Sequence, residues 1–177
     1  MLFAIDLQND YLDPEGKFYF PAVEDVLGDI KERLEEAIRT GELMACTKNI
    51  YPEDEYKDRS AETIAWAQEI HPLFRDLLRE AELFEKEHYG ISPEGALAFR
   101  EKFKDRKNDF EFIEFLGVET NVCVLANLNI IQNVFPSSGL TVSARRTVAS
   151  NPELHRSALE IMKGLKVKVL DDEYIQP

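Results

Sequence analysis

Cysteine is scarce in this sequence, and long apolar runs are absent. Only Cys46 and Cys123 occur among the 177 residues. No segment approaches the ~20 apolar residues that a membrane-spanning helix needs. No charged region followed by an apolar stretch precedes the first strand-like segment, so nothing in the pattern indicates secretion. We therefore expect a cytoplasmic protein with reduced thiols and no membrane partner.

Positive charge is also in deficit. The sequence has 21 basic and 34 acidic residues, which gives a formal net charge of -13 at pH 7. Such a surface repels a phosphate backbone and anionic lipid, so we expect no nucleic-acid partner. The length fits one compact domain over residues 1–177, and the sequence contains no internal repeat or low-complexity tract.

Strand-like and helix-like segments alternate along the chain. Short apolar or alternating segments predict strands at 1–6, 42–47, 82–89, 109–116, 139–144 and 166–170. Longer segments with helical periodicity or capping residues predict helices at 23–40, 60–70, 71–82, 92–103, 120–135 and 151–165. This alternation is typical of an α/β fold built on a parallel sheet.

The first long helix has the clearest pattern. Val26, Ile30, Leu34 and Ile38 recur at helical spacing, and Gly41 follows as a C-cap. We expect these four apolar side chains to face the core.

Ligands of parallel α/β sheets bind at the carboxyl ends of the strands, near the point where the strand order switches. Asp6, the segment around Lys86 and the turn from Gly117 to Cys123 all follow predicted strands. We therefore expect these three segments to meet in space.

Cys123 is a candidate nucleophile because the sequence places it in the first turn of a helix, with Thr120 near the N-cap. Unpaired amides and the positive end of the helix dipole lower the pKa of a thiol there, and the same amides can hold an oxyanion. Asp6 is the best-placed carboxylate to act as the base. Lys86 would keep Asp6 ionised or stabilise the thiolate.

Each of these residues also has a purely structural interpretation. A free cysteine is often a small buried hydrophobe, which is how we interpret Cys46. Asp6 would then cap a loop, and Lys86 would be a solvated surface lysine. A cysteine–histidine pair is a further alternative, for which the histidines are His71, His88 and His155.

Three sequence motifs together resemble the isochorismatase-like cysteine hydrolases, which include nicotinamidases and N-carbamoylsarcosine amidase. The motifs are "AIDLQNDYL", "EKEHYG", and "GVETNVCVLANL" followed by "TVASNPELHRSALEIMKGLKVKVL". The resemblance spans nearly the whole chain. It implies a Rossmann-like, three-layer α/β/α sandwich around a six-stranded, mainly parallel sheet, and a homo-oligomeric assembly.

The resemblance also implies a mechanism. The family's aspartate, lysine and cysteine match Asp6, Lys86 and Cys123, which would form a catalytic triad that attacks an amide carbonyl through the thiolate. The family's cis peptide bond maps to Val118–Glu119. It would direct the Glu119 amide, beside that of Cys123, at the oxyanion.

The sequence departs from the family at the metal site. Metal-dependent nicotinamidases carry an Asp-x-His pair where this chain has Asn49 and Tyr51, which are poor ligands for a divalent ion. We therefore expect no metal and no other cofactor, although Glu53, Asp54, Glu55 and His71 offer an alternative set of ligands. Arg145 and Arg146 stand where many relatives have Asp-Ala, and we expect solvated or interface positions for them.

These features predict a cysteine hydrolase that cleaves a small C–N amide or carbamoyl bond. The alternatives are an isochorismatase-type vinyl-ether hydrolase and a catalytically silent binding or assembly module of the same fold. Aromatic residues expected near the substrate pocket are Tyr11, Tyr51 and Tyr89, with Phe18 and Trp66 as further candidates.

Overall fold

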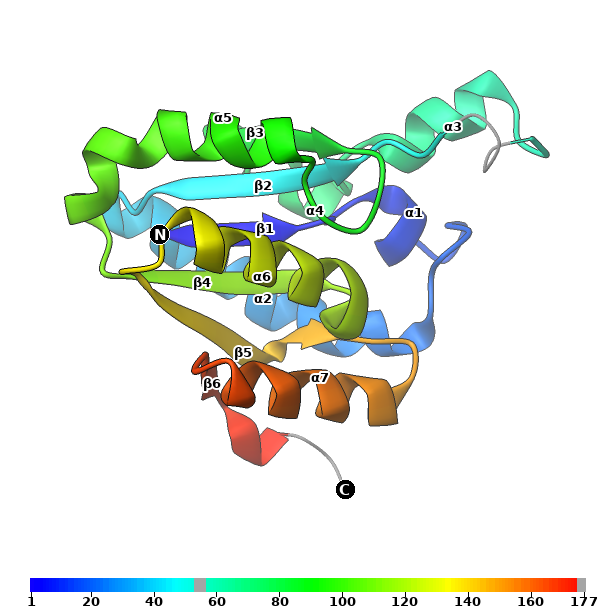
Figure 1. Cartoon of the computed structure of the whole chain (residues 1–177). Coiled ribbons are helices and arrows are strands. Elements are labelled where there is room, and N and C mark those ends of the chain that lie inside the picture. The colour runs from blue at the N-terminus through cyan, green and yellow to red at the C-terminus, as the bar shows by residue number, and fades with distance from the viewer. Residues whose placement is uncertain (53–56, 175–177) are drawn as a thin grey trace.

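The computed structural model describes residues 1–52 and 57–174, in which six strands form one sheet (Figure 1). The strand order is β3-β2-β1-β4-β5-β6, and every neighbouring pair is parallel. The strands are β1 (Leu2–Ile5), β2 (Met44–Asn49), β3 (Glu82–Lys86), β4 (Phe112–Val118), β5 (Gly139–Val148) and β6 (Lys168–Leu170). The predicted α/β class is confirmed.

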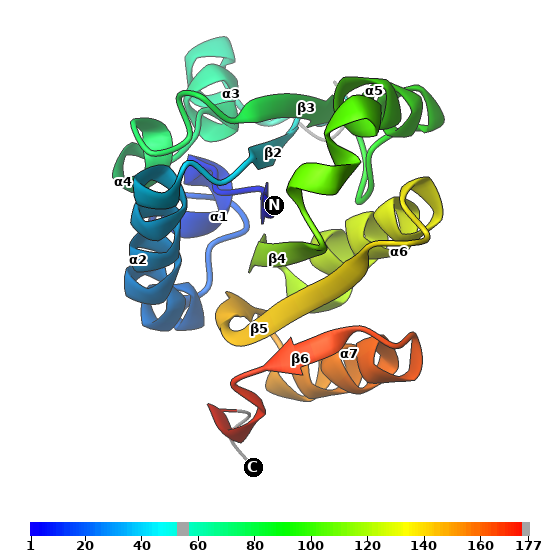
Figure 2. The same ribbon diagram turned by 90° about the vertical axis from the view of Figure 1, so that its left-hand side faces the viewer.

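Helices cover both faces of the sheet. The longer helices are α2 (Glu24–Thr40), α3 (Ala61–Gln68), α5 (Pro93–Phe103), α6 (Leu125–Val134) and α7 (Pro152–Gly164). Shorter turns are α1 (Asn9–Leu12), α4 (Pro72–Arg75) and the 3-10 segments Pro21–Val23, Lys104–Asp109 and Asp172–Tyr174. Figure 2 shows α2 and α4 on one face and α5, α6 and α7 on the other, which confirms the three-layer sandwich. No helix in the described ranges is both long enough and apolar enough to cross a bilayer.

Two hydrophobic cores lie on opposite faces of the sheet, and β1 contributes to both. Phe3 and Ile5 pack with Phe99 of α5 and the apolar residues of α6 and α7, whereas Leu2 and Ala4 pack on the α2 side. Successive side chains of a strand point to opposite faces, so a strand covered on both sides is apolar throughout. This explains why the first five residues read as one uninterrupted apolar run.

The expectation for α2 was wrong at one position. Val26, Ile30 and Leu34 are buried, but Ile38 is 50% exposed and Ala37 is fully buried in its place. A step of four residues advances the side chain by about 40° beyond a full turn, so after three such steps Ile38 has rotated out of the buried face. Gly41 ends the helix in the left-handed conformation, as predicted.

Other elements also differ in length from the prediction. The helix expected over 71–82 is helical only in α4, because the chain must turn before it enters β3 at Glu82. Strand β5 extends four residues beyond the expected end at Ala144. It is irregular there, because its pairing with β4 jumps from Val142–Phe115 to Thr147–Gly117. The extra β5 residues include Arg145 and Arg146.

The strand order switches between β1 and β4, and a glycine makes their close approach possible. Gly117 has a positive φ of 116°, and a Cβ at this position would lie 2.0 Å from the carbonyl oxygen of Ile5. Only glycine therefore lets the last residues of these strands pair side by side. Asp6 follows this contact directly on β1, and the turn that carries Cys123 follows β4.

Candidate active site

Asp6 follows β1 and is fully buried. Its backbone is left-handed, with a φ of 52°, which is uncommon for a residue other than glycine. Thr47 of β2 binds both the side chain and the backbone of Asp6. Its hydroxyl donates to Oδ1 at 2.6 Å and accepts from the Asp6 amide at 3.1 Å. The remaining carboxylate oxygen, Oδ2, lies 2.8 Å from Nζ of Lys86.

Lys86 is the last residue of β3, and its side chain is fully buried. Besides Asp6, its ammonium donates to the His88 carbonyl at 2.9 Å and to Asn49 Oδ1 at 3.2 Å. The Cys123 sulfur lies 3.5 Å from the same nitrogen. The interpretation of Lys86 as a solvated surface lysine is therefore wrong. A buried ammonium needs such acceptors, because losing water without replacement costs several kcal/mol.

Cys123 lies in the π-helical turn Thr120–Val124 that leads into α6, and it is 5% exposed. The expectation of a lowered thiol pKa was wrong. Burial, followed by the negative charge of Asp6 and a hydrogen bond to it, raises the pKa of Cys123 well above its ordinary value, and Lys86 offsets only part of this increase. The thiol is therefore protonated in the free protein near neutral pH.

The charges of the three side chains explain this result. An ionised Asp6 beside an ammonium makes a neutral pair, and ionising the thiol as well would leave a buried net negative charge. Moving the thiol proton to Asp6 produces a thiolate without changing the total charge. A thiolate formed in that way costs less in this buried cluster than one formed by loss of the proton to solvent.

The peptide bond between Val118 and Glu119 is cis. The Glu119 carbonyl accepts from the amides of Val122 and Val124, and its side-chain Oε2 accepts from the Ser150 amide at 2.7 Å. The first two bonds close the turn that carries Cys123, and the bond from Ser150 joins the start of that turn to the segment after β5.

Two of the described histidine rings have hydrogen-bond partners other than the thiol. His71 Nδ1 accepts from the Leu73 amide at the start of α4, and His155 Nδ1 is 2.8 Å from the Thr120 hydroxyl. His88 supplies a backbone carbonyl to Lys86. Among the described residues, no hydrogen bond joins a histidine ring to Cys123, although His88 lines the same cavity as the thiol.

A cavity of about 470 Å³ opens over Cys123. Tyr11, Tyr51 and Tyr89 line it, as does Phe18, whereas Trp66 does not. Tyr89 is 66% exposed, so it stands at the mouth. The remaining lining residues are Asn49, Glu87, His88, Glu119 and Val122. A cavity of this size suits a small organic molecule.

Several supporting residues were not predicted from sequence. Thr47 holds Asp6, and Asn49 accepts from Lys86 while donating to the Tyr11 hydroxyl at 3.1 Å. Asn127 of α6 donates to the carbonyls of Cys123 and Tyr89 and accepts from the Ile91 amide, so it joins the cysteine turn to the 87–91 loop. The sequence alone does not single out Asn127, because Asn129, Gln132 and Asn133 are further polar residues of the same helix.

The residues present do not fit the family's metal site. Asn49 already uses its amide oxygen on Lys86 and its amide nitrogen on Tyr11, and Tyr51 packs 5.2 Å from the ring of Phe18. Within residues 1–52 and 57–174, no group of three or more His, Cys, Asp or Glu side chains could hold an ion. Of the alternative ligands, Glu53, Asp54 and Glu55 lie outside the described residues.

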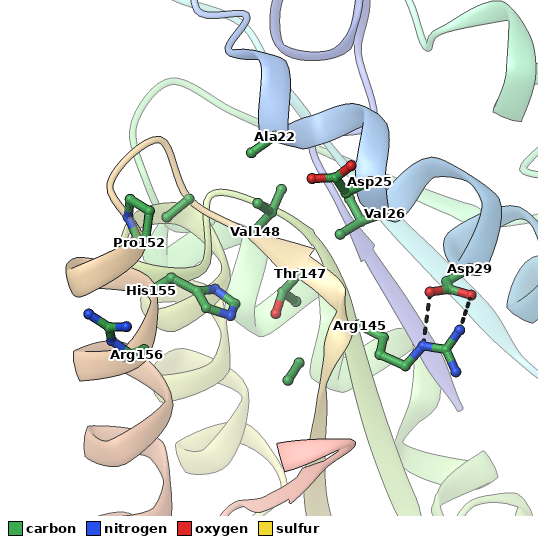
Figure 3. Close-up of a pocket in the computed structure, with 12 residues that line it drawn as sticks. Ala22, Asp25, Val26, Asp29, Arg145, Thr147, Val148, Pro152, His155 and Arg156 are labelled. Atoms are coloured by element: carbon green, nitrogen blue, oxygen red, sulfur yellow. Dashed lines mark hydrogen bonds and ion pairs between the residues drawn. The ribbon is translucent and has the colours of Figure 1, made fainter. Parts of the chain in front are cut away.

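Arg145 and Arg146 are partly exposed and make ion pairs within the chain. Arg145 makes a bidentate pair with Asp29 of α2, at 2.8 and 3.0 Å, beside a second cavity of about 500 Å³ between α2, β5 and α7 (Figure 3). Arg146 pairs with the buried Glu114 of β4 at 3.2 Å. The irregular part of β5 thus turns both arginines toward acidic partners.

Cys46 is buried in β2 and behaves as the small hydrophobe that we expected. Burial is the main factor that raises the pKa of its thiol to about 12, with further contributions from Asp6 and Glu82.

Comparison with known proteins gives matches at the level of structure. No family model and no curated protein sequence matches the chain. Among solved structures, a nicotinamidase from Bacillus subtilis is 17% identical, with a TM-score of 0.79 over 96% of this chain and 98% of that one. A pyrazinamidase of Pyrococcus horikoshii in complex with zinc is 20% identical, with a TM-score of 0.75 over 96% and 97%.

An isochorismatase-like hydrolase from Alkaliphilus metalliredigens is 18% identical, with a TM-score of 0.73 over 99% of this chain and 95% of that one. The match covers nearly the full length of all three proteins. The fold of this chain is therefore the fold of the isochorismatase-like hydrolases.

Proposed function

We propose that the protein is a cysteine hydrolase that cleaves a small C–N amide or carbamoyl bond, with Asp6, Lys86 and Cys123 as its catalytic residues. The observation that carries this proposal is the position of the Lys86 ammonium, 2.8 Å from Asp6 Oδ2 and 3.5 Å from Cys123 Sγ, beneath a cavity over the thiol. The fold shared with a nicotinamidase and a pyrazinamidase supports an amide as the substrate.

In the acylation step, the Cys123 sulfur attacks the amide carbonyl while its proton passes to Asp6. The carbonyl oxygen becomes an oxyanion, and the backbone amides of Glu119 and Cys123 would stabilise it by donating hydrogen bonds. Asp6 then gives the proton to the departing nitrogen, so the C–N bond breaks to leave a thioester and a neutral amine. Lys86 offsets the negative charge shared by Asp6 and sulfur throughout the step.

In the second step, Asp6 accepts a proton from water as the water oxygen attacks the thioester carbonyl. Collapse of the resulting intermediate releases the acid, and the proton returns to sulfur. The raised thiol pKa makes Cys123 a good recipient of that proton. The site therefore returns to its neutral resting state without an external base.

The test is a screen of primary amides, including nicotinamide and pyrazinamide, with released ammonia and the intact mass of the protein as readouts. Wild type should release ammonia and accumulate a thioester adduct on rapid acid quench. Cys123→Ala should do neither, whereas the matched Cys46→Ala variant should retain turnover. Amide turnover that survives in Cys123→Ala would refute the covalent mechanism, and labelling elsewhere would refute the assignment of the nucleophile.

A further inference from the structure

One wall of the cavity over Cys123 is a cluster of three aromatic rings, which we call the aromatic wall: Tyr11, Phe18 and Tyr51. The Tyr11 and Phe18 rings stack with centroids 5.7 Å apart and an interplanar angle of 25°. Tyr51 lies 5.2 Å from Phe18 and 6.3 Å from Tyr11. The face of an aromatic ring carries negative electrostatic potential, so such a wall attracts cations as well as apolar groups.

Among the residues that the structure describes, two charged side chains line the cavity, and both are acidic. Glu87 and Glu119 are its carboxylates, and no lysine or arginine side chain occurs among the lining residues that the structure describes. Lys86 does not compensate, because it is fully buried and already faces Asp6, Asn49 and the His88 carbonyl. The chain as a whole carries a net charge of -13, which adds to the negative potential.

A lysine of the chain lies near the aromatic wall. The Lys17 ammonium is 5.4 Å from the centroid of the Phe18 ring. Lys17 is exposed, and its backbone amide is held by Asp10 Oδ1 at 2.9 Å. The contact shows that the wall already attracts a positive charge of the chain itself. It also means that Lys17 competes with a cationic substrate for Phe18.

From these charges we propose that the substrate is an amide whose other end carries a positive charge, such as an amine or a quaternary ammonium group. The proposal rests on the proposed function. The amide carbon would lie at Cys123, the cationic group would lie against the aromatic wall, and Glu87 and Glu119 would attract it. An amide that carries a carboxylate, by contrast, would meet two like charges, and no lysine or arginine is among the described residues that line the cavity.

The test uses three primary amides with the same three-methylene spacer, which differ in the charge of the far end. They are 4-(trimethylammonio)butanamide, its neutral isostere 5,5-dimethylhexanamide, and the anion glutaramate. The spacer keeps the charge away from the reacting carbonyl, so differences in kcat/KM for ammonia release report binding. At pH 8 and low salt we expect the cation to exceed the neutral isostere by about fivefold. We expect it to exceed the anion by at least about tenfold.

Three variants connect any preference to named residues. Glu87→Gln and Phe18→Leu should each lower the cation-to-neutral ratio by about twofold or more, and Lys17→Met should raise it. Glu32→Gln on the exposed face of α2 is the matched control for removal of an acidic charge, and it should leave the ratio unchanged. A ratio at or below one, or a ratio that none of the three variants shifts, would overturn the proposal.

A binding assay separates this proposal from the proposed function. Choline and 3,3-dimethyl-1-butanol have the same shape and differ in charge, so their protection of Cys123 from iodoacetamide at pH 9 can be compared without turnover. If no amide in the series is hydrolysed, the hydrolase assignment fails on that substrate class, but stronger protection by choline still supports the cationic site. Equal protection by the two alcohols, or none, contradicts it whether or not amides are cleaved.

Discussion

The ammonium of Lys86 and the carboxylate of Asp6 form a 2.8 Å ion pair in which neither side chain has exposed surface. A pair buried this deeply contributes little net stability, because the loss of hydration offsets the attraction. Removing one partner is different, since it leaves the other charge without compensation. Burial of a pair that adds little stability agrees with the catalytic role that we propose for both residues.

The first prediction is a double-mutant cycle on this pair. Lys86→Met should lower the free energy of unfolding by about 3–5 kcal/mol, because Asp6 is left as an unpaired buried charge. The double variant Asp6→Asn/Lys86→Met should recover much of that loss. Chemical denaturation with urea measures both values. Additive effects of the two changes would mean that the pair is not coupled in solution.

A second prediction concerns the reactivity of the thiol. Because Asp6 raises the pKa of Cys123 and Lys86 opposes this, Asp6→Asn should lower the pKa and speed alkylation by iodoacetamide near pH 7.5. Lys86→Met should have the opposite effect and slow alkylation relative to wild type. In wild type the alkylation rate should keep rising above pH 9, where an ordinary cysteine is already ionised.

The same Asp6→Asn variant should lose amide turnover by at least about a hundredfold, since general base catalysis supplies 10²–10⁴ in rate. A more reactive thiol in a less active enzyme is a combination that a purely structural Asp6 would not produce. If Asp6→Asn instead slows alkylation and keeps its turnover, Asp6 does not accept the proton.

A third prediction tests the contact between β1 and β4. Gly117→Ala should lower the free energy of unfolding by more than about 3 kcal/mol or prevent folding, because the added Cβ would meet the Ile5 carbonyl oxygen at 2.0 Å. Gly28→Ala is the matched control. Gly28 lies inside α2 with nothing within 4 Å of an added Cβ, so alanine there should stabilise the protein by about 0.5–1 kcal/mol.

A fourth prediction concerns metal ions. The side chain of Asn49 already makes hydrogen bonds with Lys86 and Tyr11, so we expect it not to bind a metal ion. Dialysis against a chelator should therefore leave the amide turnover and the thermal midpoint of the protein unchanged. Activity lost on chelation and restored by zinc, iron or manganese would show that another set of residues holds an ion.

The position of the site could be predicted from sequence, but its network of partners could not. Parallel strands place their carboxyl ends at one edge, so Asp6, Lys86 and the turn before Cys123 could be expected to converge. Thr47 and Asn49 could not be identified as their partners, because that requires the lateral register of β1, β2 and β3. The direction of the Cys123 pKa depends on burial and charge, which the helix position alone did not reveal.

The arginines show a second limit of sequence patterns. Arg145 and Arg146 lie in an irregular part of β5, and their acidic partners come from α2 and β4, far along the chain. The alternation of acidic and apolar residues before Gly117 predicted a strand correctly, but it did not indicate that Glu114 is buried. Ion pairs across such separations are set by tertiary packing and leave no local signal.

Because Cys46 is buried in β2, its reaction with a thiol reagent would report on global unfolding of the protein. With an excess of a thiol reagent, the first equivalent consumed would measure access to the cavity over Cys123. The second would appear only when the sheet opens and releases Cys46 from β2. One titration followed in time would therefore separate a ligand that blocks the site from a ligand that stabilises the whole fold.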